Sequence, residues 1–121
     1  MTTKVLVVDD SVVSRKMLIR SLPKDWDISI TQAVNGQDAV EKYNEGLAEV
    51  MFLDLTMPIM DGYQVLETLQ KQGLDTFIIV VTADIQPEAE ERVRKLGAMG
   101  FVKKPVDMEK VVSILKEYGI L

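Results

Sequence analysis

Five short apolar segments recur along the chain, each bounded by polar or turn-forming residues. They cover residues 5–8, 28–30, 50–53, 77–81 and 101–102. The first, third and fourth segments are continuously apolar, which is typical of strands covered on both faces of a sheet. The pattern therefore predicts five strands with a layer of helices on each side.

Helical segments separate these strands. They cover residues 11–22, 37–45, 62–72, 87–96 and a last segment that begins after Asp107. The fourth is the clearest, because Pro87 suits a first helical turn and Ala89, Val93 and Leu96 share one face. Each predicted strand is thus followed by one helix.

This alternation of strand and helix predicts an α/β fold of five βα units, with a parallel sheet and right-handed connections. No linker or change in composition divides the chain, and 121 residues suffice for one hydrophobic core. We therefore expect residues 1–121 to form a single domain. Such sheets bind ligands outside the carboxyl ends of their strands, near the point where the strand order reverses.

The composition removes several kinds of chemistry. The formal charge is -5, and no basic run indicates contact with a phosphate backbone, which disfavours direct nucleic-acid binding. The chain has no cysteine and no histidine, so thiol nucleophiles, disulfides and histidine bases are excluded. Any chemistry must use carboxylates, hydroxyls and lysines.

The apolar runs are far shorter than the roughly 20 residues that a membrane span needs. The start of the chain also lacks the pattern of a signal peptide. We therefore expect no membrane span and a cytoplasmic location.

Charged and hydroxyl side chains stand at the carboxyl ends of the predicted strands. Asp9 and Asp10 follow the first strand, Asp54 the third, Thr82 the fourth and Lys104 the fifth. Two carboxylates about 4 Å apart repel by about 4 kcal/mol at an effective dielectric constant near 20, so a cluster of them needs a cation. Mg²⁺ prefers oxygen ligands and is the natural candidate, although a lysine across the site also supplies positive charge.

Each of these residues also suits a simpler structural role. Asp9, Asp10 and Ser11 are good candidates to cap the following helix, Thr82 is a good strand former, and Lys104 alone would be a solvated surface residue. Their joint occurrence at successive strand ends favours a functional site.

These residues carry a resemblance to a known family. The pair Asp9-Asp10, the segment LDLTMPIMDG around Asp54, the pair Thr82-Ala83 and the segment GFVKKP resemble the response-regulator receiver domain of two-component signalling. The resemblance covers nearly the whole chain. It implies the flavodoxin-like receiver fold with strand order 2-1-3-4-5, as in stand-alone chemotaxis-type receivers.

The resemblance also implies a metal site and a phosphorylation site. Asp54 would be the phosphoacceptor. Asp10, Asp54 and the backbone carbonyl of Thr56 would hold Mg²⁺, and Asp9 would bind the ion directly or through water. No histidine base is needed, because an aspartate is already ionised at neutral pH.

Three residues of the fourth and fifth strand ends receive further roles from the resemblance. Thr82 and Lys104 would contact the phosphoryl oxygens, and Phe101 would be the aromatic switch. The Lys104-Pro105 bond is usually cis in this family. Phe101 equally suits a plain core position, and the two roles are compatible.

The implied function is signalling, with no enzymatic activity beyond self-catalysed phosphorylation and dephosphorylation. The phosphoryl group would come from the phosphohistidine of a sensor histidine kinase or phosphotransfer protein, or from a small phosphodonor. The face formed by the fourth helix, fifth strand and fifth helix would then change and control a downstream protein. The protein would be a monomer or a phosphorylation-dependent dimer.

Four positions near the site affect details of this interpretation. Thr56 and Asp84 occupy family positions that vary and influence how fast the phosphoryl group is lost, and Asp84 adds negative charge there. Pro58 is expected to stiffen the loop after Asp54, and Gly62 to relax the start of the next helix.

Three other functions compete with this one. A flavodoxin-like FMN carrier shares the architecture, but Asp9 and Asp10 stand where it needs a phosphate-binding loop. A phosphatase of the haloacid-dehalogenase type carries an Asp-x-Asp pattern after the first strand, whereas these two aspartates are adjacent. A receiver-like docking module that works without phosphorylation is the third.

Overall fold

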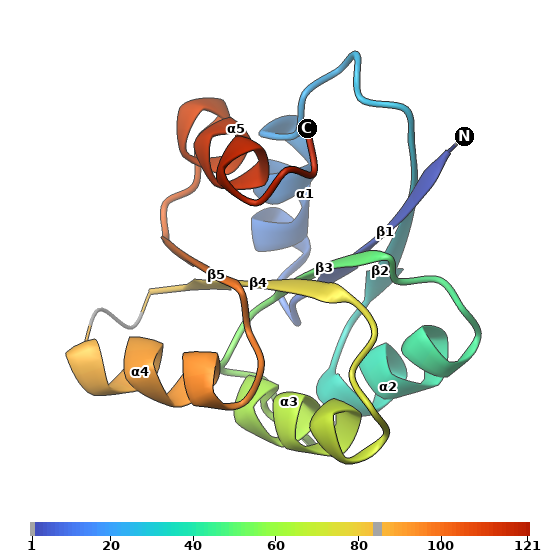
Figure 1. Ribbon diagram of the computed structural model, residues 1–121, viewed down its shortest axis with the longest axis vertical. Coiled ribbons are helices and arrows are strands. Elements are labelled where there is room, and N and C mark those ends of the chain that lie inside the picture. Colours follow the sequence, from blue (N-terminus) through green and yellow to red (C-terminus); the bar gives the residue numbers. More distant parts are fainter. Residues whose placement is uncertain (1, 84–85) are drawn as a thin grey trace.

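The computed structural model describes residues 2–83 and 86–121, which form a parallel sheet between two layers of helices (Figure 1). The strands are β1 (Thr3–Val8), β2 (Ile28–Ala33), β3 (Val50–Leu53), β4 (Phe77–Thr82) and β5 (Gly100–Lys103). The helices are α1 (Val12–Arg20), α2 (Gly36–Asn44), α3 (Gly62–Lys71), α4 (Pro87–Lys95) and α5 (Met108–Glu117). The strand order is β2-β1-β3-β4-β5, so the predicted fold class and order are confirmed.

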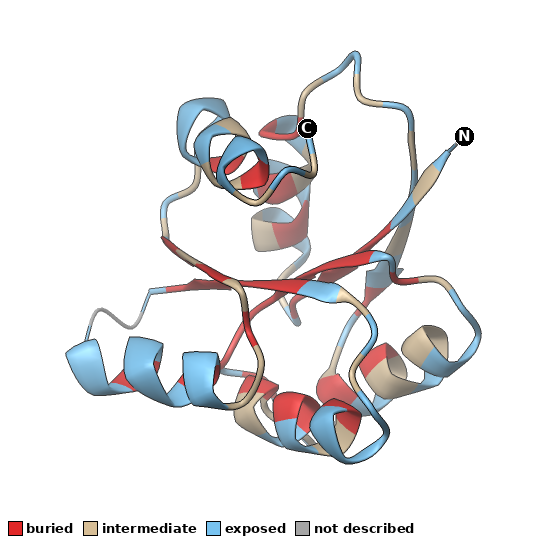
Figure 2. Cartoon of the chain, viewed as in Figure 1, coloured by how far each residue is buried: buried red, intermediate tan, exposed pale blue. Residues whose placement is uncertain are grey.

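The sheet divides the core into two halves, because successive side chains of a strand point to opposite faces. One half lies under α2, α3 and α4, and its central members include Leu6, Val8, Leu53, Val65 and Leu66. The other lies under α1 and α5, and its central members include Val5, Val7, Leu18, Phe52 and Leu115. Figure 2 shows this burial along the central strands and on the inner sides of the helices.

Several element boundaries differ from the sequence prediction by one to three residues, those of β2 and α1 among them. Strand β2 continues past residue 30 to Ala33, because Thr31 and Gln32 pair with β1 and so belong to the sheet. Helix α1 is shorter than predicted: Ser11 is its N-cap and accepts the N–H of Ser14. Neither change moves the carboxyl ends of the strands away from one another.

The five helices are short. Within residues 2–83 and 86–121, none of them has both the length and the apolar character needed to cross a bilayer.

Candidate functional site

Asp9 and Asp54 lie side by side because their strands are neighbours. Val8 of β1 is in register with Leu53 of β3, and the N–H of Asp54 donates to the carbonyl of Val8 at 3.0 Å. On the other side of β1, the N–H of Asp9 donates to the carbonyl of Ala33 at 3.1 Å. Both aspartates are buried, with exposed fractions of 6% and 7%. They stand at the carboxyl ends of β1 and β3, next to the point where the strand order reverses.

Three carboxylates converge at this point. One ligand oxygen from each of Asp9, Asp10 and Asp54 lies within 4.8 Å of the others. Asp10 is exposed whereas the other two are buried, so the cluster is accessible to solvent from the Asp10 side. An all-oxygen donor set with excess negative charge fits a hard cation such as Mg²⁺.

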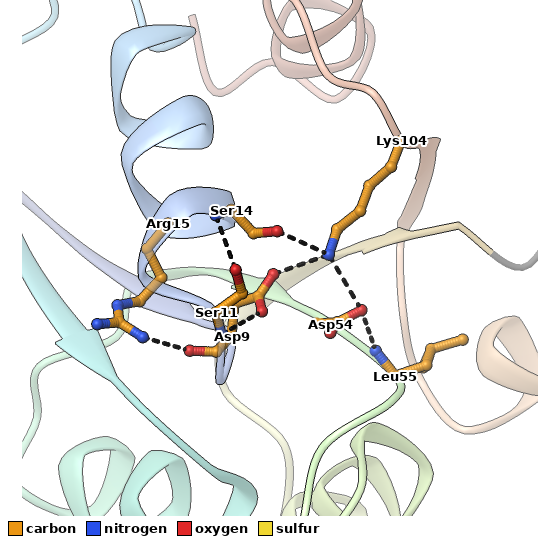
Figure 3. Close-up of polar contacts among 7 residues, drawn as sticks. All are labelled: Asp9, Ser11, Ser14, Arg15, Asp54, Leu55 and Lys104. Carbon is orange, nitrogen blue, oxygen red and sulfur yellow. Dashed lines mark hydrogen bonds and ion pairs between the residues drawn. The ribbon is translucent and has the colours of Figure 1, made fainter.

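Lys104 crosses the site from the end of β5 (Figure 3). Its Nζ lies 2.8 Å from Asp9 Oδ2 and 3.6 Å from Asp54 Oδ1. Its backbone N–H donates to the carbonyl of Thr82 at 2.8 Å, so the end of β4 positions the lysine backbone. The predicted juxtaposition of Lys104 with the aspartates is therefore present in the structure.

Local hydrogen bonds orient the two buried carboxylates. Asp9 Oδ1 accepts the N–H of Ser11 at 2.9 Å, and Asp54 Oδ1 accepts the N–H of Leu55 at 2.9 Å. Each carboxylate is thus held by the turn that follows its own strand. Ser11, and neither aspartate, provides the cap of α1.

Burial and charge shift the ionisation of Asp54 and Lys104. Burial raises the pKa of the Asp54 carboxyl above its ordinary value of 3.8, and the charge of Asp9 raises it further, whereas Lys104 acts in the opposite direction. Burial disfavours the charged form of Lys104, but its contacts with Asp9 and Asp54 outweigh this, so the pKa of the ammonium is raised. The site therefore combines a fixed ammonium, Lys104, with the Asp54 carboxylate. A further cation beside Asp54 would favour its ionised form.

The other predicted site residues lie in β4, in β5 and in the loop after β3. Thr82 is the buried last residue of β4, with an exposed fraction of 2%. Phe101 is in register with Val80 and packs, partly buried, against the core half under α2, α3 and α4, as a core residue would. Thr56 is exposed, two residues beyond Asp54. The phosphoryl contacts, the aromatic switch and the carbonyl ligand stay predictions.

The backbone after β5 was also the subject of a sequence prediction. The Lys104-Pro105 bond is cis, as the resemblance implies. The expectation for Asp84 lies outside the described residues.

Two residues of α1 that contact the site were not predicted. Arg15 is only 8% exposed, and it donates from Nη1 to the carbonyl of Asp9 at 2.7 Å and from Nε to Oε1 of Gln32 at 2.8 Å. Ser14 Oγ lies 3.5 Å from Lys104 Nζ. Charged and hydroxyl residues at the start of a helix normally face solvent, so the local sequence carried no signal for either contact.

Gly62 is needed for a different reason from the one predicted. A Cβ atom at this position would lie 2.5 Å from the carbonyl oxygen of Asp54 and 2.8 Å from the Cα of Leu55. The N–H of Gly62 donates to the carbonyl of Leu55 at 2.9 Å. The start of α3 therefore packs directly against the backbone that carries Asp54, and the glycine permits this approach instead of relaxing the helix.

A parallel five-stranded α/β sheet with clustered aspartates and a lysine at its switch point defines the class of phosphorylation-activated signalling receivers. The family comparison agrees. Residues 5–116 match the response regulator receiver domain, and the chain belongs to this family of two-component signalling proteins.

Curated relatives include whole chemotaxis proteins and longer ones. The chain is 34% identical to chemotaxis protein CheY of Listeria monocytogenes, over 94% of this chain and 96% of that protein. It is 38% identical to a protein-glutamate methylesterase/protein-glutamine glutaminase of Halalkalibacterium halodurans, over 94% of this chain. The match spans only 35% of the length of that methylesterase.

Solved structures show the same architecture. CheY in the CheX-CheY-BeF3-Mg+2 complex from Borrelia burgdorferi has a TM-score of 0.87 and 29% identity, with 96% of this chain and 88% of that chain covered. The receiver domain of NarL from Mycobacterium tuberculosis has a TM-score of 0.86 and 27% identity, with 97% and 95% covered.

Proposed function

We propose that Asp54 accepts a phosphoryl group and that this modification switches the protein between two signalling states. The observation that supports it is the position of Asp54 beside a buried carboxylate, Asp9, with the ammonium of Lys104 in contact with both. A carboxylate held in this way is a suitable nucleophile toward phosphorus, and nearby cations neutralise the transferred charge.

The transfer itself needs no base from the protein. A carboxylate oxygen of Asp54 attacks phosphorus, a P–O bond forms, and the P–N bond of a phosphohistidine breaks. The electron pair remains on the imidazole nitrogen, which takes a proton from solvent. In the later hydrolysis, water attacks phosphorus and releases inorganic phosphate, and the Asp54 carboxylate is regenerated.

Lys104 and Thr82 are proposed to hold the oxygens of the phosphoryl group. Lys104 Nζ lies 3.6 Å from Asp54 Oδ1, so a group attached to Asp54 stays within reach of a fixed ammonium. Thr82 is buried at the neighbouring strand end, and its backbone already positions Lys104.

Mg²⁺, when bound, supplies charge neutralisation and alignment of the phosphoryl oxygens. Asp9, Asp10, Asp54 and the backbone carbonyl of Thr56 would hold the ion. The converging oxygens of the three aspartates support this assignment. The presence of Mg in the complex of the Borrelia CheY neighbour supports it independently.

For the phosphoryl donor and for the downstream target, only the kind of protein is proposed. We take the donor to be a sensor histidine kinase or a phosphotransfer protein. The face of α4, β5 and α5, with Phe101 as its switch, is proposed to control a downstream protein. The pairing of CheY with CheX in the Borrelia complex supports a receiver acting by docking to another protein.

The proposed domain organisation, location and oligomeric state follow from this signalling role. Residues 1–121 are taken as one receiver domain in the cytoplasm, as a monomer or as a phosphorylation-dependent dimer. Its only chemistry is its own phosphorylation and dephosphorylation. An FMN carrier is disfavoured, because the three aspartates would repel the phosphate of the flavin nucleotide.

The direct test is phosphorylation by a small donor. Incubation with acetyl phosphate and Mg²⁺ is expected to add the mass of one phosphoryl group to the wild-type protein. Asp54→Asn, which preserves shape and removes the nucleophile, should gain none. If the wild type also gains none, the protein is a docking module that works without phosphorylation.

A further inference from the structure

A cavity of about 280 Å³ lies beside the acidic cluster, between α1, the ends of β1, β3 and β4, and the segment after β5. Most of its lining is apolar, and includes Val7, Met17, Leu18, Phe52, Val81 and Val106. Asp9, Ser14, Asp54 and Lys104 complete it, and the first three all contact Lys104, so these four residues form one polar end (Figure 3). The cavity is therefore amphipathic.

The apolar part is not used by the proposed phosphoryl chemistry. That chemistry requires the carboxylates, Lys104 and Thr82, and none of it involves Leu18, Phe52 or Val106. A largely apolar cavity holds water poorly, because ordered water needs two to four polar partners. For scale, an engineered apolar cavity of about 150 Å³ accommodates benzene, so a body of one ring with a short side chain matches this space.

The charge at the polar end selects the head group of such a ligand. Two carboxylates, those of Asp9 and Asp54, line the cavity with one cation, Lys104. Beyond the lining, Asp10 adds a third carboxylate and Arg15 a second cation. Each carboxylate oxygen of Asp9 and Asp54 has more than one lone pair, so these groups can accept further hydrogen bonds. A cationic donor is favoured there over a neutral or anionic group.

We propose that this cavity binds a small monocationic amine with an apolar body of about one ring. The body lies between α1 and the segment after β5, and the ammonium points to Asp9 and Asp54. Such a ligand uses the same carboxylates as the proposed metal site. Amine and Mg²⁺ therefore exclude each other, and the amine slows phosphorylation of Asp54.

The test uses methionine methyl resonances of the full chain labelled with ¹³C at the methionine methyl. Met17 lines the cavity, whereas Met99 lies at the opposite end of the sheet, where its N–H bonds to Ile78. Without Mg²⁺, benzylamine is expected to shift the Met17 signal saturably and to leave Met99 unchanged. Benzyl alcohol should bind about tenfold more weakly, the factor given by about 1.4 kcal/mol, and benzoate should not bind. Saturating Mg²⁺ should weaken the amine response.

A filling substitution makes the test specific to this cavity. Ser14→Leu should abolish the Met17 response to benzylamine, whereas Ser113→Leu, the same change at an exposed position of α5, should leave it intact. An unchanged Met99 signal confirms that the variant is folded, and Val106→Leu replaces Ser14→Leu if it is not.

Two results would overturn the proposal. One is the absence of any Met17 response to benzylamine. The other is an equal or stronger response to benzyl alcohol, which would mean that the cavity takes an uncharged apolar group, such as a side chain of a docked protein. Phosphorylation of Asp54 by acetyl phosphate remains a separate observation in either case.

Discussion

Asp54 occupies a position where burial and the charge of Asp9 oppose its ionisation. Its folded-state pKa is raised, so its favourable contribution to stability is present below the unfolded pKa near 3.8 and is lost as pH rises through the folded pKa. Asp54→Asn removes this loss while Lys104 keeps Asp9 as a partner. We expect the variant to melt a few degrees above the wild type at neutral pH, measured by calorimetry.

The pH dependence of the melting temperature separates the effect of the raised Asp54 pKa from a general effect of removing a charge. The difference in melting temperature should shrink as pH falls toward 3.8, because Asp54 then becomes neutral in both states of the wild type. Asp25→Asn, at an exposed position, should show no such change. A variant that is less stable than wild type at neutral pH would contradict the account.

The backbone of Ile59 is in an unfavourable conformation. Its φ of 70° is unfavourable for a β-branched residue, and the N–H of Met60 donates to the carbonyl of Pro58 at 2.7 Å around it. The side chain is 76% exposed, so little burial is lost when it is replaced. Ile59→Asn should raise the free energy of unfolding by about 1 kcal/mol, because asparagine tolerates this conformation.

Urea unfolding followed by fluorescence of Trp26, the only tryptophan of the chain, measures this effect. Ile59→Val keeps the β-branch and should not stabilise. Equal stability of the Asn and Val variants would show that the turn carries no strain.

At the scale of elements, sequence periodicity was a good guide to strands and helices, and a poorer one to their ends. Strand β2 was predicted too short because Thr31 and Gln32 are polar, yet their backbones pair with β1. An edge strand needs no continuous apolar run, because one of its sides is open. Helix starts were better defined where a capping residue was present, as at Asp107.

The contact between α3 and the backbone of Asp54 could not be predicted from the local sequence pattern. Gly62→Ala places a Cβ against backbone atoms of Asp54 and Leu55, so it should destabilise the fold by about 1–3 kcal/mol. Because the displaced backbone carries Asp54, phosphorylation by acetyl phosphate should slow as well.

A matched glycine substitution separates the loss of stability from the slower phosphorylation of Asp54. Gly119 has a φ of +72° and open space around it, so Gly119→Ala should cost about 1–2 kcal/mol through the backbone alone. Its phosphorylation rate should equal that of wild type under conditions where both proteins are folded. A normal rate in Gly62→Ala would show that this contact does not position Asp54.

At the scale of the whole molecule, the site is a consequence of topology. Asp9, Asp54 and Lys104 were predicted because each follows a strand, and a parallel sheet brings strand ends to one edge. Arg15 and Ser14 reach the same place from α1, and their contacts depend on how the helix packs over the sheet. Such tertiary contacts leave no periodic signal in the sequence.

Binding of a metal by folded but not unfolded chains stabilises the whole domain. Mg²⁺ at about one hundred times its dissociation constant should raise the free energy of unfolding by about 2.7 kcal/mol, measured by urea unfolding with EDTA as reference. Asp10→Asn should reduce this gain, because it removes one of the three carboxylates. If Mg²⁺ leaves the unfolding curve unchanged at every concentration, the cluster is not a metal site.

Of all the carboxylates in the chain, that of Asp54 is proposed to carry the phosphoryl group. Borohydride reduces an acyl phosphate to the alcohol, which converts a phosphorylated aspartate to homoserine and leaves the other carboxylates intact. After treatment with acetyl phosphate, Mg²⁺ and borohydride, peptide mass spectrometry should find homoserine at position 54. Homoserine at Asp9 or Asp10 instead, or at no position, would contradict the account.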